Sequence, residues 1–396
     1  MKWLMTFFLW LCPAVLMAQH AKFEAVIVDA RTHEPLSFAS VFSKKGNSTI
    51  TNMVGRFSIE ADSADVLHIS YVGYKPLSIQ AGSMHGRVEL SAMEMGLQEV
   101  TVEPISNLIR KTTKETLKQL QKHKRKETNF FYRQTAFKDS VCYELAEAFL
   151  SGHSAAWLRD LKLVTGRFAG IQPDSLHYYS FYSNFYTFSM IEIASKQKQQ
   201  FGGLVHLLPL SRDYANYYDV DYEVIRDGDS RLFAIHFTPK PHVRQSVLDV
   251  TLYVDESTYL VRKVEGVGRY FGIVHTDRKM VNGKVRLART KYLTDFNLVV
   301  NLTDERGFLE VQSVFIDECH EFYGNQITTR SILYNVGDRK LGKGERMDFY
   351  GVLQNQIEEQ GYDASFWRNN EIVQRTPVEQ QVMELFERNN LFGVFN

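Results

Sequence analysis

The sequence lacks an excess of charge of either sign. It contains 46 lysine and arginine residues and 46 aspartate and glutamate residues, so its formal net charge is zero when histidine is neutral. Proteins that bind nucleic acid or an anionic surface through their overall field carry a clear positive excess. We therefore predict no nucleic-acid partner, and we interpret the basic run KHKRK at 122–126 as a solvated helix end.

Signatures of catalysis are missing as well. None of the twelve histidines has a glutamate three positions later, and the sequence contains no H-E-x-x-H, G-x-S-x-G, C-x-x-C or EF-hand pattern. The stretch GDRKLGKG at 337–344 approaches a phosphate-binding loop, but Gly344 stands where such a loop needs serine or threonine. We predict no catalytic residue, no metal and no cofactor.

Cysteines and long apolar runs are both scarce. The one long run, in MKWLMTFFLWLCPAVLMAQH, has Lys2 before it and reaches Ala18. It is too short and too weakly flanked for a spanning helix, so we interpret residues 1–18 as a signal peptide. The mature protein is then exported, to the periplasm or to an outer-membrane-associated position. Cys142 and Cys319 remain, either as a disulfide or as two separate thiols.

Short strands separated by turn signals fill residues 19–103, which is typical of a β-sandwich. In DVLHISYVGYK the apolar residues predict a central strand that is buried on both sides. Gly73 then allows a bend that Tyr71 and Tyr74 would resist. Because the stretch implies no charged partner for these tyrosines, we interpret it as a structural corner and not as a catalytic site.

The same region resembles a known family. The series EPLSFASV, TITNMVGRFSI, DVLHISYVGYK and LQEVTV is similar to the carboxypeptidase regulatory-like domain of bacterial envelope proteins. The resemblance implies an immunoglobulin-like or transthyretin-like sandwich, with Gly55 and Phe57 at a turn and in the strand that follows it. It implies a fold and a compartment but no peptidase, because the zinc-ligand pattern of the carboxypeptidases is absent.

The remainder divides into a linking helix at 104–127 and a larger α+β domain at 128–396. An apolar stripe of Leu108, Ile109, Leu117 and Leu120 makes the helix amphipathic. In the larger domain, alternation in VLDVTLYVD and the Asn-Gly turn in KMVNGKVRL predict an antiparallel sheet. Its pattern loosely resembles the half-barrels of periplasmic lipoprotein carriers, although an open half-barrel, a sandwich and a closed barrel all remain compatible with it.

A helix is expected near the C-terminus. Thr376 fits the N-cap position, Pro377 fits N1 and Glu379 fits N3, the combination that starts many helices. We predict that its buried stripe consists of Val378, Val382, Leu385 and Phe386.

The stretch YYSFYSNFYTF at 178–188 has seven aromatic residues in eleven. Seven exposed rings would exceed the apolar patch of an ordinary monomer, so they belong to the core or to a partner surface. The candidate surface residues are Tyr178, Tyr179, Phe181, Tyr182, Phe185 and Tyr186.

These observations predict a non-catalytic binding or assembly protein of the cell envelope, at the periplasmic side of the outer membrane. Its partner would be an envelope protein, a glycan or a lipid, with peripheral membrane association and oligomeric state left open. The alternative is an exported hydrolase that acts on glycan or peptide through a dispersed site on the second domain.

Overall fold

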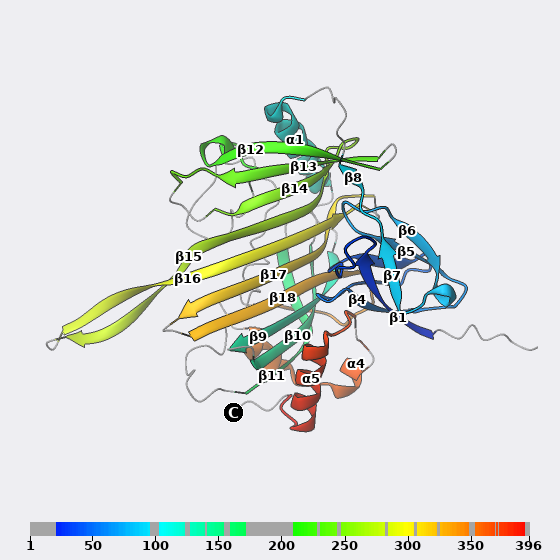
Figure 1. The fold of residues 1–396 in the computed structure, drawn as a ribbon. Coiled ribbons are helices and arrows are strands. Elements are labelled where there is room, and N and C mark those ends of the chain that lie inside the picture. Colours follow the sequence, from blue (N-terminus) through cyan, green and yellow to red (C-terminus); the bar gives the residue numbers. More distant parts are fainter. Residues whose placement is uncertain are drawn as a thin grey trace, which may run out of the picture. The chain divides into compact units, whose positions relative to one another are not determined.

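The computed structural model groups the chain into two compact units, which are described separately (Figure 1). The first comprises residues up to Ser70 together with Pro76–Leu90, and the second comprises Tyr71–Lys75 and the chain from Ser91 onward. The described residues are 21–95, 103–122, 127–138, 141–153, 159–171, 209–227, 230–243, 247–281, 284–304, 307–322, 325–347, 353–368, 370 and 372–392. The signal peptide expected at 1–18 lies outside them.

The first unit contains two small sheets that supply the expected sandwich. One has the strand order β4-β1-β7 and the other has the order β3-β2-β5-β6. β1 is antiparallel to β4 and parallel to β7. The elements are β1 (Ala21–Asp29), β2 (Ser40–Ser43), β3 (Ser48–Ile50), β4 (Arg56–Ala61), β5 (Val66–Ser70), β6 (Leu77–Gln80), the 3-10 turn η1 (Ala81–Ser83) and β7 (Arg87–Leu90).

The prediction that β5 is buried on both sides is wrong. Leu67 and Ile69 are buried, whereas Val66, His68 and Ser70 are only half-buried. Successive side chains of a strand point to opposite faces, so one face of β5 meets the sandwich core and the other does not. The valine and histidine of the outer face carry enough apolar surface to imitate a fully buried strand in the sequence.

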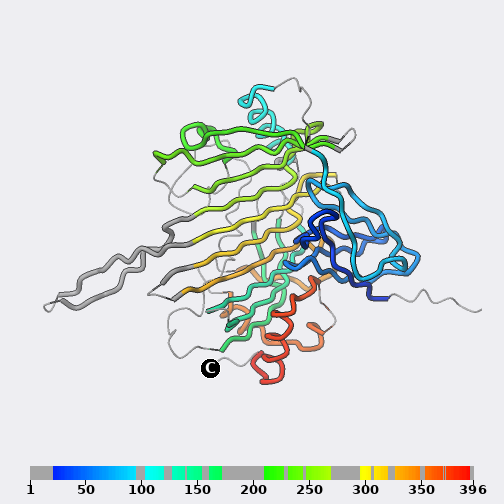
Figure 2. The backbone as a smooth tube through the Cα atoms, viewed as in Figure 1, coloured from blue at the N-terminus to red at the C-terminus, as the bar shows by residue number. Residues whose placement is uncertain are grey.

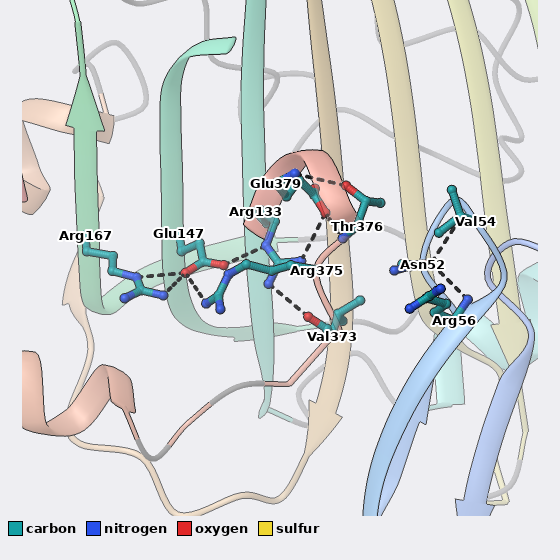
Figure 3. A network of polar contacts seen from close by, with 10 residues as sticks. All are labelled: Asn52, Val54, Arg56, Arg133, Glu147, Arg167, Val373, Arg375, Thr376 and Glu379. Atoms are coloured by element: carbon teal, nitrogen blue, oxygen red, sulfur yellow. Dashed lines mark hydrogen bonds and ion pairs between the residues drawn. The ribbon is translucent and has the colours of Figure 1, made fainter. Parts of the chain in front are cut away.

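The turn before β4 needs its glycine. The side-chain oxygen of Asn52 accepts hydrogen bonds from the backbone N–H groups of Val54 and Arg56, both at 3.0 Å (Figure 3). Gly55 has φ +72°, and a Cβ there would lie 2.6 Å from the carbonyl oxygen of Ile27. Any side chain would therefore clash with the neighbouring backbone. Phe57 follows on β4 and is fully buried.

A twelve-stranded sheet dominates the second unit. Its order is β19-β11-β10-β9-β18-β17-β16-β15-β14-β13-β12-β8, and all the neighbouring strands are antiparallel. Among the described residues, β19 and β8 are its edge strands. The strands are β8 (Glu94–Met95), β9 (Glu127–Lys138), β10 (Val141–His153), β11 (Arg159–Gly170), β12 (Tyr218–Asp227), β13 (Ser230–Pro239), β14 (Asp249–Asp255), β15 (Val261–Val281), β16 (Lys284–Thr303), β17 (Glu310–Phe322), β18 (Asn325–Gly337) and β19 (Glu345–Arg346).

One face of this sheet, here called the inner face, carries the main apolar core. Tyr132, Ala148, Val300 and Val314 lie in it together with the predicted face of β14, from Leu248 to Val254. Helices α1 (Ile105–Lys122) and α3 (Leu353–Gln360) contribute to the same core. The short 3-10 turn η3 (Tyr214–Asn216) precedes β12. The helix expected as a link is thus packed through Leu108 and Ile109 into the second unit's core.

The opposite, outer face of β10 and β11 is covered by α4 (Ala364–Arg368) and α5 (Pro377–Arg388), whose backbone is traced in orange to red in Figure 2. The start of α5 is confirmed, because Thr376 and Glu379 form a capping box. Its predicted stripe is partly wrong. Phe386 is buried with Met383, whereas Val378 and Leu385 are 50% and 43% exposed.

The expected fold class is confirmed: a sandwich, a helix, and a large antiparallel sheet followed by a C-terminal helix. Cys142 and Cys319 are both free thiols, so the disulfide alternative is ruled out. Among the helices that the structure describes, none combines the length and the apolar character needed to span a bilayer.

Candidate functional site: a basic pocket beside helix α1

A pocket of about 560 Å³ lies beside α1 in the second unit. Seven of its lining residues come from the helix and three from the segment Ser211–Tyr214. The lining residues are Ser106, Ile109, Arg110, Thr113, Lys114, Leu117, Lys118, Ser211, Arg212 and Tyr214. Ligand pockets in proteins are commonly 300–1,000 Å³, so the hollow has the size of a small-molecule site.

The helix places these side chains together because its lining positions recur every three or four residues. Positions three and four apart are neighbours on a helix surface. The first turn starts at Pro104, whose carbonyl oxygen accepts hydrogen bonds from the N–H groups of Asn107 at 2.8 Å and Leu108 at 3.1 Å. Leu108 and Ile109 then anchor the helix in the inner-face core, and the lining positions form the adjoining strip.

The lining is basic without any balancing carboxylate. Arg110, Lys114, Lys118 and Arg212 line the pocket, and no aspartate or glutamate among the described residues does. Lys118 forms an ion pair with Glu115 at 3.3 Å. Lys114 and Arg212 make no ion pair with any described residue. Four positive charges around one concave, partly apolar surface create a local positive potential, although the chain as a whole is neutral.

Lys111, another cation of α1, is paired with a carboxylate and a hydroxyl. Lys111 is not part of the lining; its ammonium lies 2.6 Å from Glu103 and donates to the Tyr259 hydroxyl at 3.0 Å. Hydrogen bonds to the Glu103 carboxylate and to Tyr259 raise the pKa of Lys111. Lys111 thus has a counter-charge among the described residues, and Lys114 of the same helix has none.

A buried hydroxyl group also faces no partner. Ser211, a lining residue, is only 8% exposed, and its Oγ has no hydrogen-bond partner among the described residues. Leaving a buried donor unsatisfied costs about 1–3 kcal/mol. An oxygen acceptor within hydrogen-bond distance of the Ser211 hydroxyl would remove that cost, because the hydroxyl would then donate a hydrogen bond to it.

The floor of the pocket is apolar. Ile109 is 3% exposed and belongs to the inner-face core, and Leu117 and Tyr214 pack against that core. The Tyr214 ring meets Phe237 edge to face, with ring centroids 6.0 Å apart. The pocket therefore presents basic groups above an apolar floor.

The tyrosine corner predicted from the sequence has partners that the sequence did not imply. Gly73 has φ +86°, and the N–H of Tyr74 donates to the carbonyl oxygen of Tyr71 at 3.0 Å. Within the second unit, the buried ammonium of Lys263 lies 3.1 Å from the Tyr71 hydroxyl and 2.6 Å from Glu265. Burial alone would lower the pKa of Lys263, but Tyr71 and Glu265 outweigh it and raise that pKa.

The aromatic surface predicted at Tyr178, Tyr179, Phe181, Tyr182, Phe185 and Tyr186 lies outside the described residues.

Among the residues that are described, no three histidine, cysteine or acidic side chains are grouped so as to hold a metal ion. The sequence GDRKLGKG leads from β18 to β19 and not into a helix, unlike a phosphate-binding loop. Burial raises the pKa of the Cys142 thiol to about 12, which keeps it protonated.

A second group of basic side chains lies on the outer face. Glu147 on β10 stands directly opposite Arg133 on β9 and Arg167 on β11 in the strand register. The carboxylate of Glu147 accepts from Arg133 Nε at 2.6 Å and from Arg167 Nε at 2.8 Å (Figure 3). All three side chains are at most 3% exposed.

The C-terminal segment completes this arginine–glutamate network, which comprises Arg133, Glu147, Arg167, Arg375 and Glu379. Arg375 lies 3.5 Å from Glu147, and Glu379 lies 3.8 Å from Arg133. Arg133 also donates to the backbone carbonyl of Val373 at 2.9 Å (Figure 3). Since its charges are buried and paired with one another, the network fastens the C-terminal segment to the sheet and offers no surface to a ligand.

Two glutamates of β10 have opposite electrostatic surroundings. Burial alone would raise the pKa of Glu147, but Arg167, Arg375 and Arg133 outweigh it and hold that pKa far below its ordinary value. Glu144, on the inner face, has no such cations, and burial raises its pKa well above the ordinary value.

Comparisons with known proteins match the sandwich region to a domain family. Residues 24–102 match the family model of the CarboxypepD_reg-like domain, which confirms the resemblance of the sandwich region. No curated protein matches the chain by sequence.

Among solved structures, a LolA superfamily protein from Nitrosomonas europaea is 11% identical and has a TM-score of 0.22. The match covers 62% of this chain and 95% of that one. A DUF1329 family protein from Desulfovibrio piger is also 11% identical, with a TM-score of 0.26 and coverages of 61% and 96%. Scores this low carry no argument about fold or function.

Sequence reasoning missed the α1 pocket. Its one visible signal was the spacing of Arg110, Lys114 and Lys118, four residues apart on a helix that was correctly expected. The contribution of Ser211 and Arg212 carried no sequence signal, because about ninety residues separate them from the helix.

Proposed function

We propose that this protein is a non-catalytic binding protein of the cell envelope, and that the α1 pocket holds its ligand. One observation carries the proposal: among the described residues, four basic side chains and no carboxylate line a concave site, and three of these cations have no ion pair, namely Arg110, Lys114 and Arg212. Side chains that serve only the fold are normally paired when they converge, as Lys111 and the arginine–glutamate network are.

The envelope part of the proposal has two supports. The N-terminal apolar run has the pattern of an export signal. Residues 24–102 match the CarboxypepD_reg-like domain family, and the resemblance to that family implies a bacterial envelope protein. We propose the periplasmic side of the outer membrane as the place of action.

The non-catalytic part is supported by the spacing of the buried inner-face carboxylates. Glu318 pairs in register with Thr329, Thr329 with Ala136, and Ala136 with Glu144. Three strand spacings of about 4.8 Å put the two glutamates about 14 Å apart along the sheet. Glycosidase carboxylates lie about 5–9.5 Å apart, so this pair does not suit the glycan-hydrolase alternative.

The test uses the mature protein purified from its native envelope under mild conditions. Native mass spectrometry of the intact protein would reveal a noncovalently bound molecule, and mass spectrometry of the extract would give its composition. We expect wild type to carry a ligand. A Thr113→Trp variant, which fills the pocket from its lining, should arrive empty.

The control is Asn355→Trp, which puts the same ring on an exposed position of α3 outside the lining and should keep the ligand. The proposed site fails if Thr113→Trp retains the molecule. The non-catalytic role fails if wild type turns over substrates in a panel of glycans and peptides.

A further inference from the structure

The ligand of the α1 pocket can be specified further from the chemistry of its lining, on the premise that the proposed function holds. The first constraint is charge. A cation or a neutral sugar would leave Arg110, Lys114 and Arg212 without a counter-charge. An anionic group satisfies all four and supplies acceptor oxygens, which ammonium and guanidinium groups require because they only donate.

The second constraint is the hydroxyl of Ser211. It is more than nine-tenths buried, belongs to the pocket lining and has no partner among the described residues. A serine hydroxyl donates one hydrogen bond. Arg212, its chain neighbour, is exposed and lines the same pocket. An oxygen acceptor would satisfy the Ser211 hydroxyl, and the requirement for negative charge comes from the cations alone.

The third constraint is the hydrocarbon floor. Ile109, Leu117 and Tyr214 line the pocket and belong to, or pack against, the inner-face core. A small hydrated anion, such as free phosphate, would leave this floor in contact with water. A ligand with an apolar part covers it, and the burial of that part adds affinity in proportion to the area covered.

We propose that the α1 pocket binds an amphiphile with one anionic headgroup, a phosphate or a carboxylate, joined to a hydrocarbon chain. The headgroup lies among Arg110, Lys114 and Arg212, beside Ser211. The first part of the chain lies on Ile109, Leu117 and Tyr214. An acidic peptide shares the charge but not the continuous hydrocarbon, and it becomes an outcome of the test.

Isothermal titration calorimetry on the delipidated mature protein would test this with four probes below their micellar concentrations. The probes are dodecyl phosphate, dodecanoate, uncharged dodecanol and inorganic phosphate. We expect the two anionic amphiphiles to bind at least tenfold more tightly than dodecanol or inorganic phosphate. Their affinity should fall as salt rises, because screening weakens the headgroup contacts.

Two double variants are compared. The first pair combines Lys114→Gln with Arg212→Gln, and the control pair combines Lys340→Gln with Lys343→Gln. The control pair also removes two exposed positive charges from the second unit, away from the pocket lining. Loss of charge-assisted hydrogen bonds should weaken binding of dodecyl phosphate at least tenfold in the first pair. The control pair should bind as wild type does, and binding of dodecanol should be the same in all three proteins.

Each contrary result would overturn a different part of the proposal. Equal binding of dodecanol and dodecyl phosphate overturns the anionic headgroup, and equal binding of inorganic phosphate overturns the hydrocarbon part. No binding of any amphiphile, with an acidic peptide bound instead, overturns the ligand class. In all three cases the proposed function is judged independently, by whether the Thr113→Trp protein loses the molecule that copurifies with wild type.

Discussion

Two groups of basic side chains in the second unit differ in how their charge is balanced. The arginine–glutamate network surrounds Glu147 with Arg133, Arg167 and Arg375, and the charges are buried against one another. The α1 pocket gathers four cations, and its described lining contains no carboxylate. Burial of unpaired charge is expensive, so the fold had to balance the first group internally. The pocket, open to solvent, can leave its charge for a ligand.

The largest expected effect is that of Glu147→Gln. Removing the negative charge leaves three arginines facing one another in a dry environment, and breaking a buried ion pair in this way costs about 3–5 kcal/mol. We expect the free energy of unfolding to fall by that amount at pH 7, measured by urea denaturation. The control is Glu387→Gln, an exposed position of α5, which should leave stability unchanged.

The effect of Glu147→Gln should also depend on pH. The folded-state pKa of Glu147 is depressed, so its stabilisation is complete above the unfolded-state pKa of about 4.3. That stabilisation is lost as pH falls from there toward the folded-state pKa. The gap between wild type and variant should therefore narrow in acid. A gap that stays constant from pH 7 to pH 3 would contradict the charge-pairing interpretation.

A smaller effect of opposite sign is expected for Glu144→Gln, three residues away on the same strand. Its folded-state pKa is raised, so its contribution to stability is full below about pH 4.3 and is lost as pH rises through the folded value. Glutamine stays neutral throughout. We expect the variant to be more stable than wild type by about 1 kcal/mol at pH 7, and equal to it near pH 4. Loss of stability at pH 7 would show that the Glu144 carboxylate has a partner.

The smallest effect on stability is expected for Lys114→Gln combined with Arg212→Gln. Because neither side chain is paired, their loss should change the free energy of unfolding by less than about 0.5 kcal/mol. Urea denaturation of the ligand-free protein would measure this. A loss comparable to that of Glu147→Gln would place these cations in the fold and remove the distinction between the two groups.

Much of the fold was predictable because its determinants are local. The side-chain oxygen of Asn52 accepts from the N–H groups of Val54 and Arg56, two and four residues later. Thr376 caps its helix through the N–H group of Glu379, three residues later. The alternation of apolar residues from Leu248 to Val254 predicted a strand with one buried face, and the structure buries the alternate apolar side chains of this range. In these segments the residues that decide the structure are close together in the chain.

The predictions that failed concern positions whose burial or partner depends on a segment far away in the chain. The sequence of α5 offers more than one apolar stripe, and the face that is buried depends on Leu145 and Phe392, which pack with Met383 and Phe386. Leu385 therefore ended in solvent. Likewise, Glu147 meets two arginines only because β10 pairs with β9 and β11 in one register, which no local pattern specifies.

The hydrogen bond from Arg133 to Val373 joins positions 240 residues apart. At ribosomal speeds of about 5–20 residues per second, the first partner exists for about 12 to 48 seconds before the second is synthesised. During that interval the guanidinium groups of β9 and β11 have Glu147 but not their C-terminal cover. A chain truncated before α4 would leave this charged strand surface exposed. We expect proteases of the cell to recognise that surface and to degrade the truncated chain.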